Sequence, residues 1–245
     1  MVEPTPSTPE PAEAASATAL ASQLFAAEPS KRSVFWRICQ VPCRVAATLL
    51  FDFKVFGIEH VPRTGGAILA SNHQSNLDPV LLSVRLSRPV TYMAKVELFK
   101  KPAFAWLIRS LHAFPVKRGA GDVGAMKEAI RLLQNGYLLN FFPEGTRTRD
   151  GEIGPIQPGV ALVVKRAGVP VIPVAIDGAY ESMGRGDKLF RRFPILMQYG
   201  APLSFHGMKG EQIVTLLGDT LRGLLLELRE KRRAMERDDP WRKRA

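Results

Sequence analysis

A histidine and an aspartate five residues apart are the side chains of this sequence best suited to chemistry. His73 and Asp78 lie in the polar run Asn72–Pro79, directly after the apolar stretch Ala67–Ser71. If that stretch is a strand, the run is a loop at its carboxyl end, where open α/β sheets place their ligands. Asp78 before Pro79 is typical of a helix N-cap. A loop that folds back would bring the carboxylate to one ring nitrogen of His73 and leave the other nitrogen free to accept a proton. A lone histidine is more often structural, and the nearby carboxylate is what favours catalysis.

A second polar stretch, Phe142–Thr148 (FPEGTRT), also follows an apolar run. Gly145 lets the backbone approach a ligand, and Thr146 supplies a hydroxyl. Arg147 offers the planar fork that binds phosphate through two hydrogen bonds. Glu144 is placed to brace that fork or to contact a substrate hydroxyl. Taken alone, the stretch is more typical of a surface turn with a salt bridge.

Both stretches need a sheet to position them, and the sequence predicts one. Short apolar runs alternate with helical patterns, which favours an α/β fold with a largely parallel sheet. We therefore predict a single α/β domain with a central, mostly parallel mixed sheet flanked by helices. The predicted strands are Ala67–Ser71, Val90–Ala94, Ala113–Val116, Tyr137–Phe142, Val171–Ile176 and Ile195–Tyr199, and the predicted helices begin at Asp78 and Asp122 or cover Val160–Ala167 and Ile213–Leu228.

The N-terminal quarter differs from the rest of the chain. Residues 1–30 are rich in Pro, Ala, Ser, Thr and Glu, so we expect a disordered tail, and they lack the basic start and apolar block of a secretory signal. Residues 31–56 are apolar but studded with basic side chains, and the cleanest apolar run, Val45–Phe51, is much shorter than the ~20 residues of a spanning helix. We expect 31–56 to form an amphipathic helix pair, interrupted at Pro42, in a membrane interface. A helix packed on the core is the alternative.

Charge narrows the range of partners. The formal net charge is +11, and residues 1–30 contain four Glu and no Lys or Arg. The other 215 residues therefore hold 34 basic and 19 acidic side chains, which suits nucleic acid, an anionic membrane surface or a phosphorylated substrate. Aromatic residues are not interleaved with the basic ones, so we predict no nucleic-acid partner. The basic run near the C-terminus, which includes Arg229 and Arg232, is expected on a solvated face or against anionic lipid.

Taken together, the motifs resemble those of the glycerolipid acyltransferase family, which includes the 1-acylglycerol-3-phosphate acyltransferases. Four blocks match in order over roughly residues 54–200, and each is moderately specific while the set is strongly so. The blocks are Asn72 and His73 with Asp78, then Phe114–Gly119, Phe142–Thr148 and Val169–Val174.

This resemblance implies a role for each matched residue. His73 takes the proton from the acceptor hydroxyl, and Asp78 orients His73. The acceptor oxygen then attacks the acyl thioester directly, without an acyl-enzyme, so Ser75 is not expected to be a nucleophile. Substrate binding falls to Asn72, Arg118, Glu144, Gly145, Thr146 and Arg147, with the two arginines on the acceptor phosphate.

The resemblance also implies an activity and a location. Residues 57–245 would form an acyltransferase domain that moves a fatty acyl group to the sn-2 hydroxyl of 1-acylglycerol-3-phosphate, giving phosphatidic acid. The donor substrate would be acyl-CoA or an acyl-carrier protein, with no cofactor and no metal. The enzyme would act at the cytoplasmic face of the membrane as a peripheral or monotopic protein. Glycerol 3-phosphate or another lysolipid is the alternative acceptor.

Two readings from other classes are weaker. Gly119–Gly124 (GAGDVG) fits the dinucleotide pattern G-x-G-x-x-G, but Lys117 and Arg118 separate it from its strand and two predicted strands precede it, which disfavours an oxidoreductase. A non-catalytic lipid-binding or scaffold protein would not need both His73 and Asp78. The remaining histidines lack ligand spacing, so no metal site is predicted.

Overall fold

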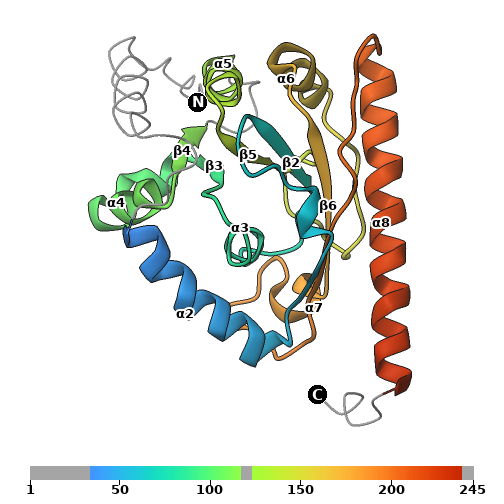
Figure 1. The fold of residues 1–245 in the computed structure, drawn as a ribbon. Coiled ribbons are helices and arrows are strands. Elements are labelled where there is room, and N and C mark those ends of the chain that lie inside the picture. Colours follow the sequence, from blue (N-terminus) through green and yellow to red (C-terminus); the bar gives the residue numbers. More distant parts are fainter. Residues whose placement is uncertain (1–33, 117–122, 239–245) are drawn as a thin grey trace, which may run out of the picture.

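A seven-stranded sheet forms the centre of the protein, whose computed structural model describes residues 34–116 and 123–238 (Figure 1). Its strands are β1 Lys54–Phe56, β2 Ala67–Ser71, β3 Thr91–Lys95, β4 Ala113–Val116, β5 Leu138–Phe141, β6 Val171–Asp177 and β7 Leu196–Tyr199. Their order in the sheet is β1-β7-β6-β2-β5-β3-β4. The strands from β6 to β4 are parallel, whereas β7 runs antiparallel to β6 and pairs in parallel with β1. The predicted α/β fold with a mostly parallel mixed sheet is confirmed.

Helices cover both faces of this sheet (Figure 1). The helices are α2 Val34–Phe51, α3 Asp78–Ser83, α4 Pro102–Ser110, α5 Val123–Gln134, α6 Gly159–Ala167, α7 Ala179–Met183 and α8 Gly210–Asp238, with short 3-10 helices at Ile58–His60 and Val96–Lys100. Side chains of α5, α6 and α8 form one buried cluster with Ile68 and Leu139, and side chains of α2, α3 and α7 form another with Leu69 and Leu138. Consecutive strand residues point to opposite faces, which is why neighbours such as Leu138 and Leu139 belong to different clusters.

The two central strands show why the sequence folds this way. Every residue of β2 (AILAS) and β6 (VIPVAID) is buried. A parallel strand covered by helices on both sides has no solvent face, so its sequence is a continuous apolar run without alternation. These two runs fix the centre of the sheet, and the polar loops that follow them lie at one edge.

Most predicted elements are present with ends shifted by one or two residues, whereas α8 extends from Gly210 to Asp238, well beyond the predicted Ile213–Leu228. β2 and β4 have the predicted bounds, and the helix expected from Asp122 begins at Val123, the first described residue after the gap. The sequence pattern missed β1, α4 and α7. β1 has only three residues and α7 only five, too few to show a periodicity. The tail expected at residues 1–30 lies outside the described part of the chain.

α2 differs from the expected helix pair, because it is one continuous helix with Pro42 inside it. Among the described residues it is the one helix long and apolar enough to cross a membrane, judged by length and composition alone. One stripe of α2 is apolar and exposed: Val34, Ile38, Val41, Val45 and Leu49 are between 52% and 66% exposed. The last residues of the 31–56 segment belong to the sheet, as strand β1.

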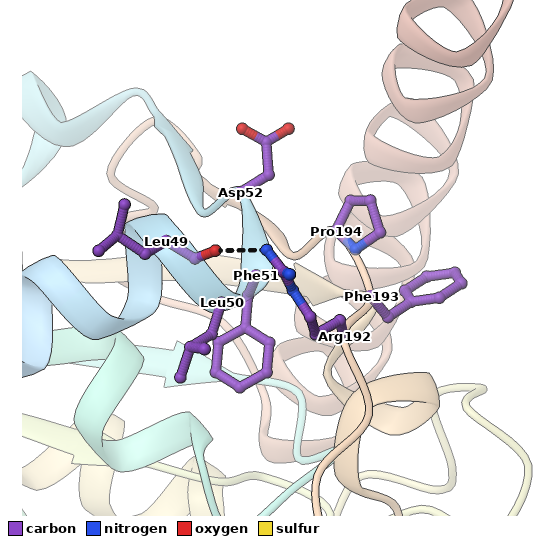
Figure 2. A pocket seen from close by; sticks show the side chains of 7 residues that line it. All are labelled: Leu49, Leu50, Phe51, Asp52, Arg192, Phe193 and Pro194. Carbon is purple, nitrogen blue, oxygen red and sulfur yellow. Dashed lines mark hydrogen bonds between the residues drawn. The ribbon is translucent and has the colours of Figure 1, made fainter. Parts of the chain in front are cut away.

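The opposite face of α2 is attached to the domain. Gln40 donates hydrogen bonds from Nε2 to the carbonyl oxygens of Ser83 and Leu86, at 2.8 and 2.9 Å. At the C-terminal end of α2, the Arg192 guanidinium donates to the carbonyl oxygen of Leu49 at 3.1 Å, beside a small cavity of about 190 Å³ (Figure 2). These bonds hold the helix in place while its apolar stripe faces outward.

Candidate active site

Three neighbouring parallel strands end at the same edge of the sheet. β2 pairs with β5 on one side and with β6 on the other, all in parallel. Their carboxyl ends are Ser71, Phe141 and Asp177. The His73 loop follows the first of these residues and the Phe142–Thr148 stretch follows the second, so the sheet brings the two predicted motifs side by side.

His73 and Asp78 form the expected pair. The distance from His73 Nδ1 to Asp78 Oδ2 is 2.8 Å, and both side chains are buried. A carboxylate can only accept at this contact, so Nδ1 carries the proton and Nε2 keeps its lone pair. Nε2 makes no hydrogen bond to any residue in the described ranges. This is the arrangement that a general base needs.

The carboxylate of Asp78 is held by the loop rather than used as a helix cap. Its Oδ2 accepts hydrogen bonds from the backbone amides of Gln74 and Ser75, at 2.7 and 2.8 Å. The N-cap position of α3 is Leu77, and Asp78 is the first residue of the helix. The expectation of an Asp78 N-cap is therefore wrong: Oδ2 accepts from amides that precede Asp78, and Oδ1 has no hydrogen-bond partner among the described residues. The two amide hydrogen bonds still fix the orientation of the Asp78 carboxylate, which contacts His73.

The second motif holds the backbone of His73 on both sides. Glu144 Oε1 accepts a hydrogen bond from the His73 amide at 2.9 Å, and the Thr148 amide donates to the His73 carbonyl at 2.8 Å. The ring of Phe142 stacks on the imidazole, with 3.8 Å between centroids and 13° between planes. The histidine ring is thus fixed by a carboxylate, a stacked ring and two backbone hydrogen bonds.

Both carboxylate oxygens of Glu144 accept hydrogen bonds from backbone amides. Its second oxygen, Oε2, accepts a hydrogen bond from the Gly154 amide at 2.9 Å. Burial raises the pKa of Glu144, and the hydrogen bonds from Gly154 and His73 oppose that shift. Within the described residues, Glu144 makes no ion pair with Arg147, so the bracing expected from the sequence is not seen. Each oxygen of the carboxylate instead meets a backbone donor.

The turn at Gly145–Arg147 is more exposed to solvent than the buried His73 loop. Gly145 has a φ of 70°, in the left-handed region that favours glycine, and its amide closes the turn by donating to the Phe142 carbonyl at 3.0 Å. Gly145 and Thr146 are exposed. Arg147 is half-buried and makes no ion pair or hydrogen bond to any described residue. Its guanidinium is therefore available to an anion.

Two other residues were predicted to bind substrate, Asn72 and Arg118. The Asn72 side chain both donates to the carbonyl and accepts from the amide of Ile176, at 2.9 and 2.8 Å, which ties the His73 loop to β6. Arg118 lies outside the described residues, as does most of the Gly119–Gly124 motif. β4 ends at Val116 on the same edge, three places from β2 in the sheet order.

The profile of the family described as "Acyltransferase" matches residues 52–177, which is just over half of the chain. The chain belongs to the acyltransferase family. The matched region contains every predicted site residue, including those on the His73 loop and on the Phe142–Thr148 stretch.

Three relatives of this acyltransferase are all named as 1-acyl-sn-glycerol-3-phosphate or 1-acyl-sn-glycerophosphate acyltransferases. The chain is 28% identical over 200 residues to the 1-acyl-sn-glycerol-3-phosphate acyltransferase of Bacillus subtilis, covering 80% of this chain and 98% of that one. It is 29% identical over 164 residues to the chloroplastic enzyme LPAT1 of Arabidopsis thaliana, but spans only 46% of that protein. Among solved structures it resembles the 1-acyl-sn-glycerophosphate (LPA) acyltransferase PlsC of Thermotoga maritima, with a TM-score of 0.68, 29% identity, and coverage of 78% of this chain and 79% of that one.

Some residues that shape the site of this acyltransferase were not found from the sequence. Gln74 bridges two loops: its Nε2 donates to the Gly151 carbonyl at 3.1 Å, and its Oε1 accepts from the Tyr180 amide at 3.2 Å. Gly154 supplies the second amide to Glu144. The partners are distant in the sequence, so no local pattern predicts them. Across the described residues no cluster of metal-ligating side chains occurs.

Proposed function

We propose that this acyltransferase transfers a fatty acyl group from a thioester to the sn-2 hydroxyl of 1-acylglycerol-3-phosphate, forming phosphatidic acid. The observation that carries the proposal is the buried His73–Asp78 pair next to a turn that contains Arg147, with no hydrogen-bond partner for His73 Nε2 or for the Arg147 guanidinium among the described residues. The names of the relatives from Bacillus subtilis and Thermotoga maritima support the same acceptor.

In the proposed mechanism His73 is the general base. Its Nε2 takes the proton from the acceptor hydroxyl while the hydroxyl oxygen forms a bond to the thioester carbonyl carbon. The carbon–sulfur bond then breaks, and the imidazolium returns the proton to the leaving thiolate, so that an ester and a free thiol are the products. Asp78 stabilises the imidazolium between these steps. General-base assistance of this kind contributes about 10²–10⁴-fold.

The acceptor phosphate is proposed to bind at the open turn. Arg147 directly precedes Thr148, whose amide is bonded to the His73 carbonyl, so an anion held by Arg147 would lie near the base. Gly145 and Thr146 would line the same surface, and Arg118, which lies outside the described residues, is proposed as a second guanidinium for the phosphate. Glu144 and Asn72 would position the loops without touching the substrate.

The apolar stripe of α2 supports a membrane location. Exposed residues such as Val41, Val45 and Leu49 are unfavourable in water and suit the lipid interface. A groove of about 450 Å³ beside the stripe is also lined by Arg44 and Arg85, and neither arginine is ion-paired among the described residues. Guanidinium groups beside an apolar surface match anionic lipid headgroups. These features support contact with a membrane, and we propose that the enzyme acts at its cytoplasmic face, as a peripheral or monotopic protein.

One assay tests the activity and identifies both substrates. The purified protein is given radiolabelled acyl-CoA or acyl-carrier protein together with 1-acylglycerol-3-phosphate, glycerol 3-phosphate or an uncharged monoacylglycerol. We expect labelled phosphatidic acid from the first acceptor with at least one donor. Faster acylation of glycerol 3-phosphate would correct the acceptor, and no transfer from either donor would favour a non-catalytic lipid-binding protein.

Vesicle flotation tests the membrane location. Replacing both Val41 and Val45 by Ser should release the protein from vesicles that contain anionic lipid. The matched control is Leu226→Ser, because Leu226 is an equally exposed leucine (59%) on the distant helix α8. Equal loss of binding in the control, or none in the double variant, would show that α2 is not the membrane contact.

A further inference from the structure

The C-terminal helix α8 lies outside residues 52–177, which match the family profile, yet one of its arginines reaches the loop behind the site. Arg229 contacts Glu152 with Nη1 at 2.7 Å and donates from Nη2 to the Gly151 carbonyl at 3.2 Å. Its Nε lies 3.5 Å from Asp177, at the end of β6. One guanidinium thus joins the sheet edge to the loop. The sequence-based expectation of a solvated or lipid-facing Arg229 is wrong.

The contacted loop is the one that holds the base. Gly151 accepts a hydrogen bond from Gln74, the residue after His73. Three residues further on, the Gly154 amide donates to Glu144, whose other oxygen holds the His73 amide. Both hydrogen bonds depend on where the loop at Gly151–Gly154 lies. Among the described residues, Arg229 is the α8 side chain that is hydrogen-bonded to that loop.

We infer that Arg229 is a positioning residue for the acyl transfer: it fixes the loop at Gly151–Gly154, which in turn sets the position of His73. This inference rests on the proposed role of His73 as general base. Arg229 touches neither His73 nor the proposed phosphate site, so its effect would pass through Gln74 and Glu144. A shift of about 1 Å in a reacting group can cost about 100-fold in rate, so a partial loosening should be measurable.

The helix offers two matched controls. Arg232 also pairs with Asp177, at 2.8 Å, but among the described residues it makes no hydrogen bond or ion pair with the loop. Arg222 pairs with Asp219 on the exposed face of α8, at 2.9 Å. The first control separates the loop contact from the charge of Asp177, and the second reports the cost of losing any arginine of this helix.

The experiment compares the full-length variants Arg229→Gln, Arg229→Lys, Arg232→Gln and Arg222→Gln. For Arg229→Gln we expect kcat to fall about tenfold while KM for the acceptor changes less than about twofold, because the geometry of the base and not phosphate binding is altered. Arg229→Lys keeps a cation but lacks the fork, so it should fall between wild type and Gln. The two controls should keep a kcat within about twofold of wild type.

Hydrogen exchange at residues 148–154 supplies a readout that does not depend on turnover. We expect faster exchange there in both Arg229 variants and unchanged exchange in Arg222→Gln. If Arg229→Gln does not fold, the same measurements on Arg229→Lys decide. The inference is overturned if kcat and exchange are unchanged in the Arg229 variants, or if Arg232→Gln lowers kcat as much. Absence of turnover in the wild type would instead refute the proposed function, while exchange still tests the loop contact.

Discussion

The His73 loop and the turn at Gly145–Arg147 lie at the same sheet edge, but their polar groups are used in opposite ways. In the His73 loop the imidazole, the Asp78 carboxylate and the backbone amides are buried and bonded to one another. In the turn, Thr146 is exposed and Arg147 has no partner among the described residues. Hydrogen bonds among the buried groups hold the imidazole in one orientation, whereas an unpaired guanidinium near the surface can bind an anionic ligand.

This contrast implies that the two regions affect different kinetic constants. Changes in the closed loop should lower kcat, because they alter the transition state more than the bound substrate. Changes in the open turn should raise KM for acceptors that carry a phosphate. The comparison fails if variants of the two regions give the same kinetic pattern.

The largest effect is expected from His73→Ala. Loss of the general base should lower kcat by about 10²–10⁴-fold. The protein should stay folded, because the backbone bonds from Glu144 and Thr148 do not involve the ring, but loss of the ring's contacts with Asp78 and Phe142 should lower the melting temperature. Steady-state kinetics and thermal unfolding measure the two quantities. Turnover close to wild type would refute the mechanism.

Arg147→Gln should change substrate binding instead. Removing a charge-assisted contact worth about 1.5–3 kcal/mol should raise KM for 1-acylglycerol-3-phosphate by about 10–100-fold, with a smaller change in kcat. The control is Arg149→Gln, because Arg149 is an exposed neighbour whose backbone carbonyl accepts from the Tyr180 hydroxyl and whose guanidinium makes no ion pair or hydrogen bond among the described residues. An uncharged acceptor should not distinguish the variants. Equal KM values for Arg147→Gln and wild type would show that the acceptor phosphate does not bind at this turn.

Glu144→Gln tests the link between the two regions. Both oxygens of Glu144 accept backbone amides, and a glutamine amide has only one acceptor, so one buried donor loses its partner. We expect a loss of about 1–3 kcal/mol in the free energy of unfolding, and a fall in kcat of about tenfold, because the position of His73 relaxes. Denaturant unfolding and steady-state kinetics give both values. A higher KM with unchanged kcat would instead mean that Glu144 contacts the substrate.

The sequence predicted the parts of this site that are local. The apolar runs located β2, β5 and β6, and the five-residue spacing located the pair of His73 and Asp78. The roles of Glu144 and Arg229 were not predicted, because each depends on partners brought close only by the sheet topology. Glu144 and Arg147 are three residues apart, which suggested an ion pair between them. In the structure Glu144 instead accepts hydrogen bonds from two backbone amides.

The smallest effect is expected from Ser75→Ala, although a serine two residues from the proposed general base resembles a nucleophile. Its hydroxyl donates to the Met183 carbonyl at 2.6 Å and accepts from the Leu77 amide at 3.2 Å, so it supports the loop. We expect kcat within about threefold of wild type and a loss of about 1 kcal/mol in the free energy of unfolding. The control is Ser83→Ala, whose hydroxyl donates to the Val80 carbonyl on α3. Mass spectrometry of the protein incubated with donor alone should show no acyl group on Ser75; an acylated serine would replace the one-step transfer by an acyl-enzyme route and make the closed loop part of the covalent chemistry.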